Sequence, residues 1–86
     1  MAHHTLKFGA VLPLDDFARA RSVAEKAEES GFYAVAAEDH FFMTSLMGHD
    51  RTTPRLECFT LLSALAPVTK RLVLTQLVAA NSFRHP

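Results

Sequence analysis

The stretch YAVAAEDHFF, residues 33–42, decides the fold that this chain is expected to adopt. It begins as a short apolar run with three alanines, and such small side chains suit a parallel strand that is buried on both faces. The run ends in Glu38, Asp39 and His40. Because α/β folds keep their chemistry at the carboxyl ends of parallel strands, we expect Asp39 and His40 to lie at such an end.

Two further apolar runs predict strands on either side of residues 33–38. Residues 6–12 form the first, which ends before Pro13 because a proline cannot donate to a central ladder. Residues 72–80 form the last, and this run is too short to span a bilayer. The sequence therefore predicts three strands.

Amphipathic helices are predicted in the two intervals between these strands. The first helix has its N-cap at Asp15 or Asp16 and ends at Gly31. The second has its N-cap at Thr53 and ends before Pro67. The apolar face expected for the second helix consists of Leu56, Phe59, Leu62, Ala64, Leu65 and Ala66.

The resulting order is β-α-β-α-β, which predicts an α/β domain of three parallel strands joined by two right-handed helical crossovers. With 86 residues, the chain makes one domain with a thin core. The turn after the first strand has no glycine cluster, so neither the dinucleotide-binding fingerprint nor a phosphate loop is present. The connection at residues 41–55 is longer than usual, and long loops at this end of a sheet are often functional.

Charge and cysteine content argue against several classes of protein. Nine basic and nine acidic side chains cancel, so no footprint for nucleic acid or for an anionic membrane is expected. The single cysteine, Cys58, cannot form an internal disulfide and is expected in the core as a small apolar residue. The first residues lack the pattern of a signal peptide, and we expect a cytoplasmic protein.

Residue types alone leave the roles of Asp39 and His40 open. The pair can hold an imidazole in one tautomer, bind a polar cofactor edge or carry a proton. Alternatively, Asp39 caps the turn after the strand and His40 is a histidine at the edge of the core. A metal site with His49 and Asp50 lacks any recognised ligand spacing, so no metal is expected.

The loop after the strand also carries aromatic and thioether side chains, namely Phe41, Phe42, Met43 and Met47. These side chains either wall a flat ring system or cover the edge of the sheet. The residues alone do not decide between the two.

Six segments, in this order and spacing, resemble the amino-terminal part of the luciferase-like oxidoreductases, and most closely the branch that uses the deazaflavin coenzyme F420. The segments are KFGAVLP, EESGF, EDHFF, RLECFTLLSALA, TKRLVL and NSFRHP. The resemblance covers nearly the whole chain from Lys7 to Pro86. It implies a TIM (β/α)₈ barrel, of which residues 1–86 would be an amino-terminal fragment, a partial barrel with three parallel strands and two helices.

The resemblance also implies an activity and a site. Family members act as monooxygenases or hydride-transfer dehydrogenases on small organic substrates, which implies coenzyme F420 as cofactor, or FMN as the alternative. By position, Asp39 resembles a cofactor-contacting acid, and His40 resembles a cofactor contact that is also the catalytic acid or base. Gln76 and Leu77 fall where relatives carry a non-proline cis peptide bond against the cofactor. Ala79 departs from the hydroxyl residue that often contacts the cofactor.

The length of the chain leads to a second hypothesis. A complete (β/α)₈ barrel typically needs about 250 residues, so we expect this chain to be truncated, marginally stable and inactive when isolated. Its strand edges would pair with another copy, giving a homo-oligomer, or with a missing part. The alternative function is therefore a catalytically silent half-barrel fragment that self-associates or complements the remainder. A response-regulator-like module with Asp39 as acceptor lacks the acidic pair expected after the first strand.

Overall fold

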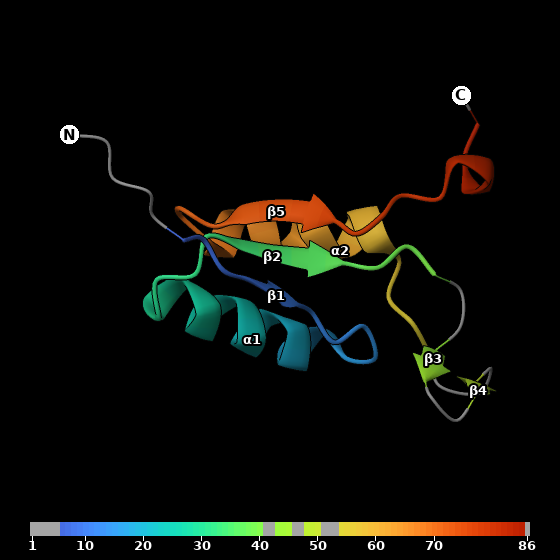
Figure 1. Ribbon diagram of the computed structural model, residues 1–86, viewed down its shortest axis with the longest axis horizontal. Coiled ribbons are helices and arrows are strands. Elements are labelled where there is room, and N and C mark those ends of the chain that lie inside the picture. Colours follow the sequence, from blue (N-terminus) through green and yellow to red (C-terminus); the bar gives the residue numbers. More distant parts are fainter. Residues whose placement is uncertain (1–5, 41–42, 46–47, 51–53, 86) are drawn as a thin grey trace.

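Three parallel strands form the central sheet of the computed structural model, which describes residues 6–40, 43–45, 48–50 and 54–85. The strands are β1 (Gly9–Val11), β2 (Ala34–Ala37) and β5 (Val73–Gln76). Their spatial order is β1-β2-β5, with β2 in the centre (Figure 1). Together with two α-helices they make an open α/β sheet of the kind that a partial barrel has, which confirms the predicted fold class.

The connections contain the remaining elements. The two α-helices are α1 (Phe17–Glu29), between β1 and β2, and α2 (Cys58–Leu65), before β5. Two 3-10 helices follow α2 and β5, namely η1 (Ala66–Val68) and η2 (Asn81–Phe83). A small antiparallel hairpin of β3 (Met43–Ser45) and β4 (Gly48–Asp50) lies in the long connection, for which no strand was predicted. Among the helices described, none has the length and apolar character that a bilayer span requires.

Both helices pack on the same face of the sheet. Ala10, Val35 and Leu74 are register partners across the three strands, and all three belong to or pack against one apolar cluster with side chains of α1 and α2. On the opposite face, Val11 and Val73 remain 55% and 39% exposed. Within the described residues, the helices therefore cover one face of the sheet and leave the other open.

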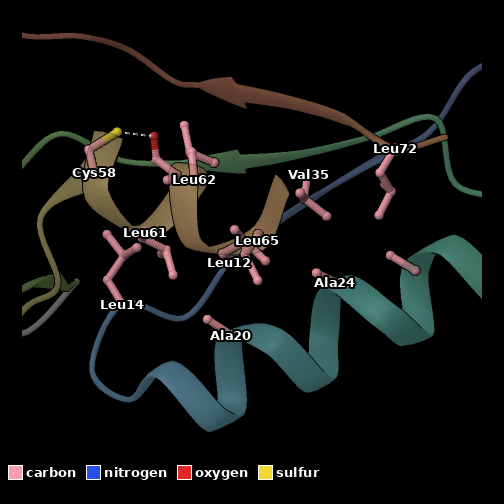
Figure 2. Packing of buried hydrophobic residues seen from close by; sticks show 12 residues of the cluster. Leu12, Leu14, Ala20, Ala24, Val35, Cys58, Leu61, Leu62, Leu65 and Leu72 are labelled. Carbon is pink, nitrogen blue, oxygen red and sulfur yellow. Dashed lines mark hydrogen bonds between the residues drawn. The ribbon is translucent and has the colours of Figure 1, made fainter. Parts of the chain in front are cut away.

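The core combines small side chains on α1 with large ones on α2. Ala20, Ala24 and Ala27 recur along one side of α1 and are buried, so this helix approaches the sheet closely. Leu61 and Leu65 of α2 fill the space between the helices and the sheet (Figure 2). The cluster is small, as expected for a chain of this length.

The ends of α1 follow the sequence prediction. Asp16 is the N-cap, and its carboxylate accepts a hydrogen bond of 2.9 Å from the backbone N–H of Ala18. After the helix, Gly31 adopts a φ of +83°, a conformation that glycine tolerates without strain. The N–H of Phe32 then donates back to the carbonyl of Ala27. Local sequence signals thus determine both ends of this helix.

The start of α2 differs from the prediction. The helix begins at Cys58 with Glu57 as its N-cap, whereas the sequence analysis expected a start near Thr53, a residue that lies outside the described part of the chain. The segment before the helix is held by the N–H of Leu56, which donates to the carbonyl of Leu14 at 2.7 Å. The Glu57 carboxylate then accepts hydrogen bonds from backbone N–H groups of the first turn.

The buried face of α2 matches the expected one only in part, since Leu62 and Leu65 are buried as predicted but other expected members are not. Phe59 is 37% exposed, and Ala64 and Ala66 are exposed as well. The buried side chains of the helix are Cys58, Leu61, Leu62 and Leu65. Figure 2 shows the Cys58 thiol directed at the end of β2, where Sγ lies 3.5 Å from the carbonyl oxygen of Ala37. The prediction that Cys58 is a core residue is confirmed.

The outer strands are shorter than the apolar runs that predicted them. The ladder between β2 and β5 ends at the pair Ala37 and Gln76, and residues 77–80 continue outside the sheet. The peptide bond between Leu77 and Val78 is cis. The cis bond expected at Gln76 and Leu77 therefore lies one residue later.

A carboxylate joins the end of α1 to the start of β5. Oε2 of Glu28 accepts hydrogen bonds from three successive backbone N–H groups, those of Lys70, Arg71 and Leu72, at 2.9, 2.6 and 2.9 Å. These hydrogen bonds lower the pKa of Glu28, with the Arg71 N–H as the largest cause. This contact lies at the amino-terminal edge of the sheet, opposite to the edge that carries Asp39.

Candidate functional site

A cavity of about 420 Å³ lies beside the carboxyl end of β2. Its walls come from the end of β2, the start of α2 and the segment after β5. The lining residues are Asp39, His40, Arg55, Leu56, Glu57, Cys58, Phe83 and Arg84. Asp39 and His40 thus lie at the strand end predicted from the sequence and share one cavity, although neighbouring residues of a regular strand would face opposite sides. Their chemical roles remain predictions.

Asp39 is the one polar residue among the buried residues that the structure describes. Its Oδ2 accepts hydrogen bonds from Nη1 of Arg84 at 2.5 Å and from the backbone N–H of Ala80 at 2.7 Å. Its Oδ1 accepts a hydrogen bond from Nη2 of Arg84 at 2.8 Å. The Arg84 hydrogen bonds are the largest cause that lowers the pKa of Asp39 to about 2, and burial opposes them. This carboxylate is ionised, and three hydrogen bonds reach its two oxygens.

Arg84 contacts α2 as well as the end of β2. Its Nη2 donates to Oε2 of Glu57 at 2.5 Å, and its guanidinium carbon lies 4.3 Å from the centre of the Phe59 ring. The pKa of Arg84 is raised, with the Asp39 hydrogen bonds as the largest cause. The pKa of Glu57 is lowered to about 2 by its hydrogen bonds with Thr60 and, next, with Arg84. One guanidinium thus joins two carboxylates of different elements.

His40 has a different environment, with its side chain 48% exposed. Its Nδ1 lies 3.4 Å from Oε2 of Glu38. Arg55 contacts the same Glu38 oxygen at 3.3 Å and donates to the backbone carbonyl of His40 at 3.2 Å. The Arg55 side chain is only 6% exposed, so it fixes this turn of the chain from inside. The imidazole is the open member of the Asp39 and His40 pair.

Cys58 forms part of the cavity wall but is not an activated thiol. Burial is the largest cause that raises its pKa, and the negative charge of Asp39 adds to this effect. A raised pKa disfavours the thiolate, which is the nucleophilic form. Cys58 therefore contributes packing to the cavity wall and is not suited to act as a nucleophile.

Gln76 and Leu77, the other two predicted site residues, lie at the same edge of the sheet but do not line the cavity. Gln76 is the register partner of Ala37, and the N–H of Leu77 donates to the carbonyl of Ala37 at 2.9 Å. The side chains of Leu77 and Val78 are 57% and 66% exposed. Together they form an apolar rim beside the end of β2.

The next candidate is the metal site that His49 and Asp50 suggested in the sequence. In the part of the chain that the structure describes, no group of three or more His, Cys, Asp or Glu side chains is arranged to hold a metal ion. The suggestion that aromatic and thioether side chains wall a ring system depends on Phe41, Phe42 and Met47, which lie outside the described residues. It stays a prediction.

Arg55, Glu57, Phe83 and Arg84 are site residues that the sequence reasoning did not identify. Arg84 belongs to the segment NSFRHP and Glu57 to the segment RLECF. Both segments carry the family resemblance, but it implied no role for these two residues. A signal for Arg84 was present, because a buried Asp needs a cationic or N–H partner and this segment offers an arginine.

A family model described as luciferase-like monooxygenase matches residues 2–86 of the chain. No curated protein and no solved structure matches it significantly. The match covers the described sheet, both helices and the whole of the cavity wall.

Proposed function

This chain belongs to the luciferase-like monooxygenase family, and we propose that its cavity is part of a flavin-type cofactor site in an oxidoreductase. The family is one of oxidoreductases that generally use flavin or deazaflavin cofactors. Our more specific proposal is coenzyme F420, with FMN as the alternative. The reaction would be hydride transfer or monooxygenation of a small organic substrate.

The position of the cavity is the observation that carries this proposal. It lies beside the carboxyl end of β2, which is the edge where barrel enzymes hold their ligands. A volume of about 420 Å³ is within the range of about 300 to 1,000 Å³ for small-molecule sites. Its wall combines an aromatic ring, Phe83, with a few polar groups, as cofactor sites do. The residues present therefore fit a flat, partly polar ring system.

His40 is the residue that we propose as catalytic. The cofactor supplies the hydride chemistry, while the protein supplies orientation, charge and proton transfer. An imidazole exchanges protons near neutral pH, and that of His40 is open to the cavity. Gln76 and Leu77 are proposed to contact the cofactor from the neighbouring strand end. Asp39, at the position of the family's cofactor-contacting acid, is proposed as the ionised carboxylate of the site beside His40.

The described sheet leaves one face without a covering element, so the site is proposed to be incomplete in the isolated chain. We therefore expect weak binding and no turnover. The test is an NMR titration of the isotope-labelled chain with FMN and with F420, at ligand concentrations on the order of 1 mM. Shifts confined to His40, Gln76, Leu77 and Phe83 would support the proposal. An absence of shifts, or shifts scattered over α1 and the β1 edge, would refute it.

A second function, a silent half-barrel that pairs with another copy, is favoured by the open face. Val11 and Val73 are exposed there, and within the described sheet β1 and β5 each have one unpaired edge. Analytical ultracentrifugation separates the two proposals. A dimer that shows no cofactor-induced shifts would support the second function, whereas a compact monomer that unfolds cooperatively would contradict it.

A further inference from the structure

We propose that Arg84 is a positioning residue of this site, which occupies the Asp39 carboxylate and thereby leaves His40 as the member of the pair that meets a ligand. Arg84 would do so by joining the end of β2, the first turn of α2 and the segment after β5. The link to a cofactor rests on the proposed function. The contacts that define the role of Arg84 do not.

The geometry at Asp39 leaves little capacity for a further partner. Its side chain is 5% exposed, and three hydrogen bonds reach its two oxygens, two from Arg84 and one from the N–H of Ala80. A carboxylate has about four acceptor sites, so most of them are in use. A cofactor that bound this carboxylate through more than the one remaining acceptor site would have to displace Arg84 or the N–H of Ala80.

Arg84 is itself fixed from two other directions. Its Nη2 also donates to Glu57, which accepts backbone hydrogen bonds at the start of α2, and its guanidinium lies over the Phe59 ring. A planar fork that pairs with two carboxylates and stacks on a ring is a geometry that arginine provides and lysine does not. Any shift of α2 relative to β2 would therefore be transmitted to the cavity wall through this side chain.

Asp39 and His40 differ in the charged groups that surround them. The titratable and charged groups that line the cavity with Asp39 are His40, Arg55, Glu57, Cys58 and Arg84. Arg84 dominates among them and keeps the pKa of Asp39 near 2, so this carboxylate does not exchange protons near neutral pH. The His40 side chain is 48% exposed, and its Nδ1 lies 3.4 Å from Oε2 of Glu38. Asp39 thus supplies a fixed negative charge, and His40 is the more exposed side chain of the pair.

The test is a carboxyl ¹³C NMR titration of the chain between pH 6 and 3.5, and it uses the variants Arg84→Met and Arg84→Lys. Arg19→Met is the matched control, because Arg19 also contacts an aspartate at 2.6 Å, but this pair is exposed. In the unmodified chain we expect Asp39 to remain ionised at about pH 4, where an unperturbed aspartate is about half protonated.

Arg84→Met should move the Asp39 midpoint to about pH 4 or above, because the carboxylate loses its counter-charge and stays buried. Arg84→Lys should give an Asp39 midpoint between those of the unmodified chain and Arg84→Met. Arg19→Met should leave the Asp39 midpoint unchanged. If Arg84 contributed only packing through its aliphatic stem, neither Arg84 variant would change the titration midpoint of Asp39. An Asp39 that is half protonated at about pH 4 in the unmodified chain would overturn the proposal, even if the Arg84 variants fail to fold.

Ligand titration separates this inference from the proposed function. On addition of FMN or F420, the His40 resonances should shift while the Asp39 carboxyl and Ala80 amide resonances stay in place. A shift of both Asp39 and Ala80 would show that the ligand displaces the Arg84 contact and would overturn the inference. If no resonance shifts, the proposed cofactor site is wrong, and the Asp39 midpoint alone decides the role of Arg84.

Discussion

Arg84 donates to both carboxylate oxygens of Asp39 across 45 positions of the sequence, at 2.5 and 2.8 Å. A bidentate pair of this kind fixes direction as well as distance. Because Asp39 follows β2 and Arg84 follows η2, the pair holds the ends of two neighbouring strands in one arrangement. The stability of the chain and the shape of its candidate site therefore depend on the same contact.

The first prediction concerns acid. The pKa of Asp39 is about 2 in the folded chain, below its ordinary value of 3.8, so the unfolded chain binds the proton more readily. This contribution to stability is complete above pH 4 and is lost as the pH falls from about 4 through 2. We expect the free energy of unfolding to fall over that window by on the order of 2 kcal/mol from Asp39 alone.

Urea denaturation followed by circular dichroism at several pH values measures this effect. Glu28 and Glu57, whose pKa values are also lowered, contribute with the same sign. The informative comparison is therefore with Asp39→Asn, which should be less stable at pH 6 and should lose less stability on acidification. An equal acid dependence in both proteins would show that the Arg84 contact does not bias the protonation of Asp39.

The second prediction concerns the opposite edge of the sheet. Glu28→Gln should lower Tm, because the neutral amide offers one oxygen, without charge, to the three N–H groups that precede β5. Glu29→Gln is the matched control, since Glu29 is the next residue of α1 and is exposed. Thermal unfolding should show a clearly larger fall for Glu28→Gln. Equal falls would mean that the Glu28 contacts do not stabilise the start of β5.

The third prediction separates core from rim. Leu65 has no exposed surface, so Leu65→Ala should cost about 2 to 5 kcal/mol and unfold much of a chain with so small a core. Leu77 is 57% exposed, so Leu77→Ala should cost less than about 1 kcal/mol. Denaturant titration of both variants provides the measurement. Similar losses of stability would show that residues after β5 are buried, for example by another copy of the chain.

How much of this could be predicted from the sequence depends on how local the signals are. The ends of α1 were predictable, because Asp16 and Gly31 act within a few residues of the helix. The start of α2 was not, since Thr53 offered an equally good local cap. The observed start at Cys58 follows a backbone hydrogen bond between Leu56 and Leu14, a contact between distant parts of the chain.

The same distinction applies to the site. Asp39 and His40 could be placed because one buried strand determines which end of it they occupy. Arg84 could not be paired with Asp39 from the pattern, because the two residues are 45 positions apart and six further elements lie between them. The cis peptide bond was expected one residue too early, since the resemblance fixes the segment better than it fixes the register within the segment.

The last prediction isolates His40 from the fold around it. The His40 side chain is about half exposed, and its contact with Glu38, at 3.4 Å, is long, so His40→Ala should change the free energy of unfolding by less than about 1 kcal/mol. The same substitution should abolish or strongly reduce the shifts that FMN or F420 induces at Leu77 and Phe83. Leu77→Ala should weaken the ligand-induced shift at Phe83 with little loss of stability, because Leu77 lies at the exposed rim of the site. If His40→Ala leaves the ligand-induced shifts intact, the imidazole does not meet the ligand, and the catalytic role proposed for it is wrong.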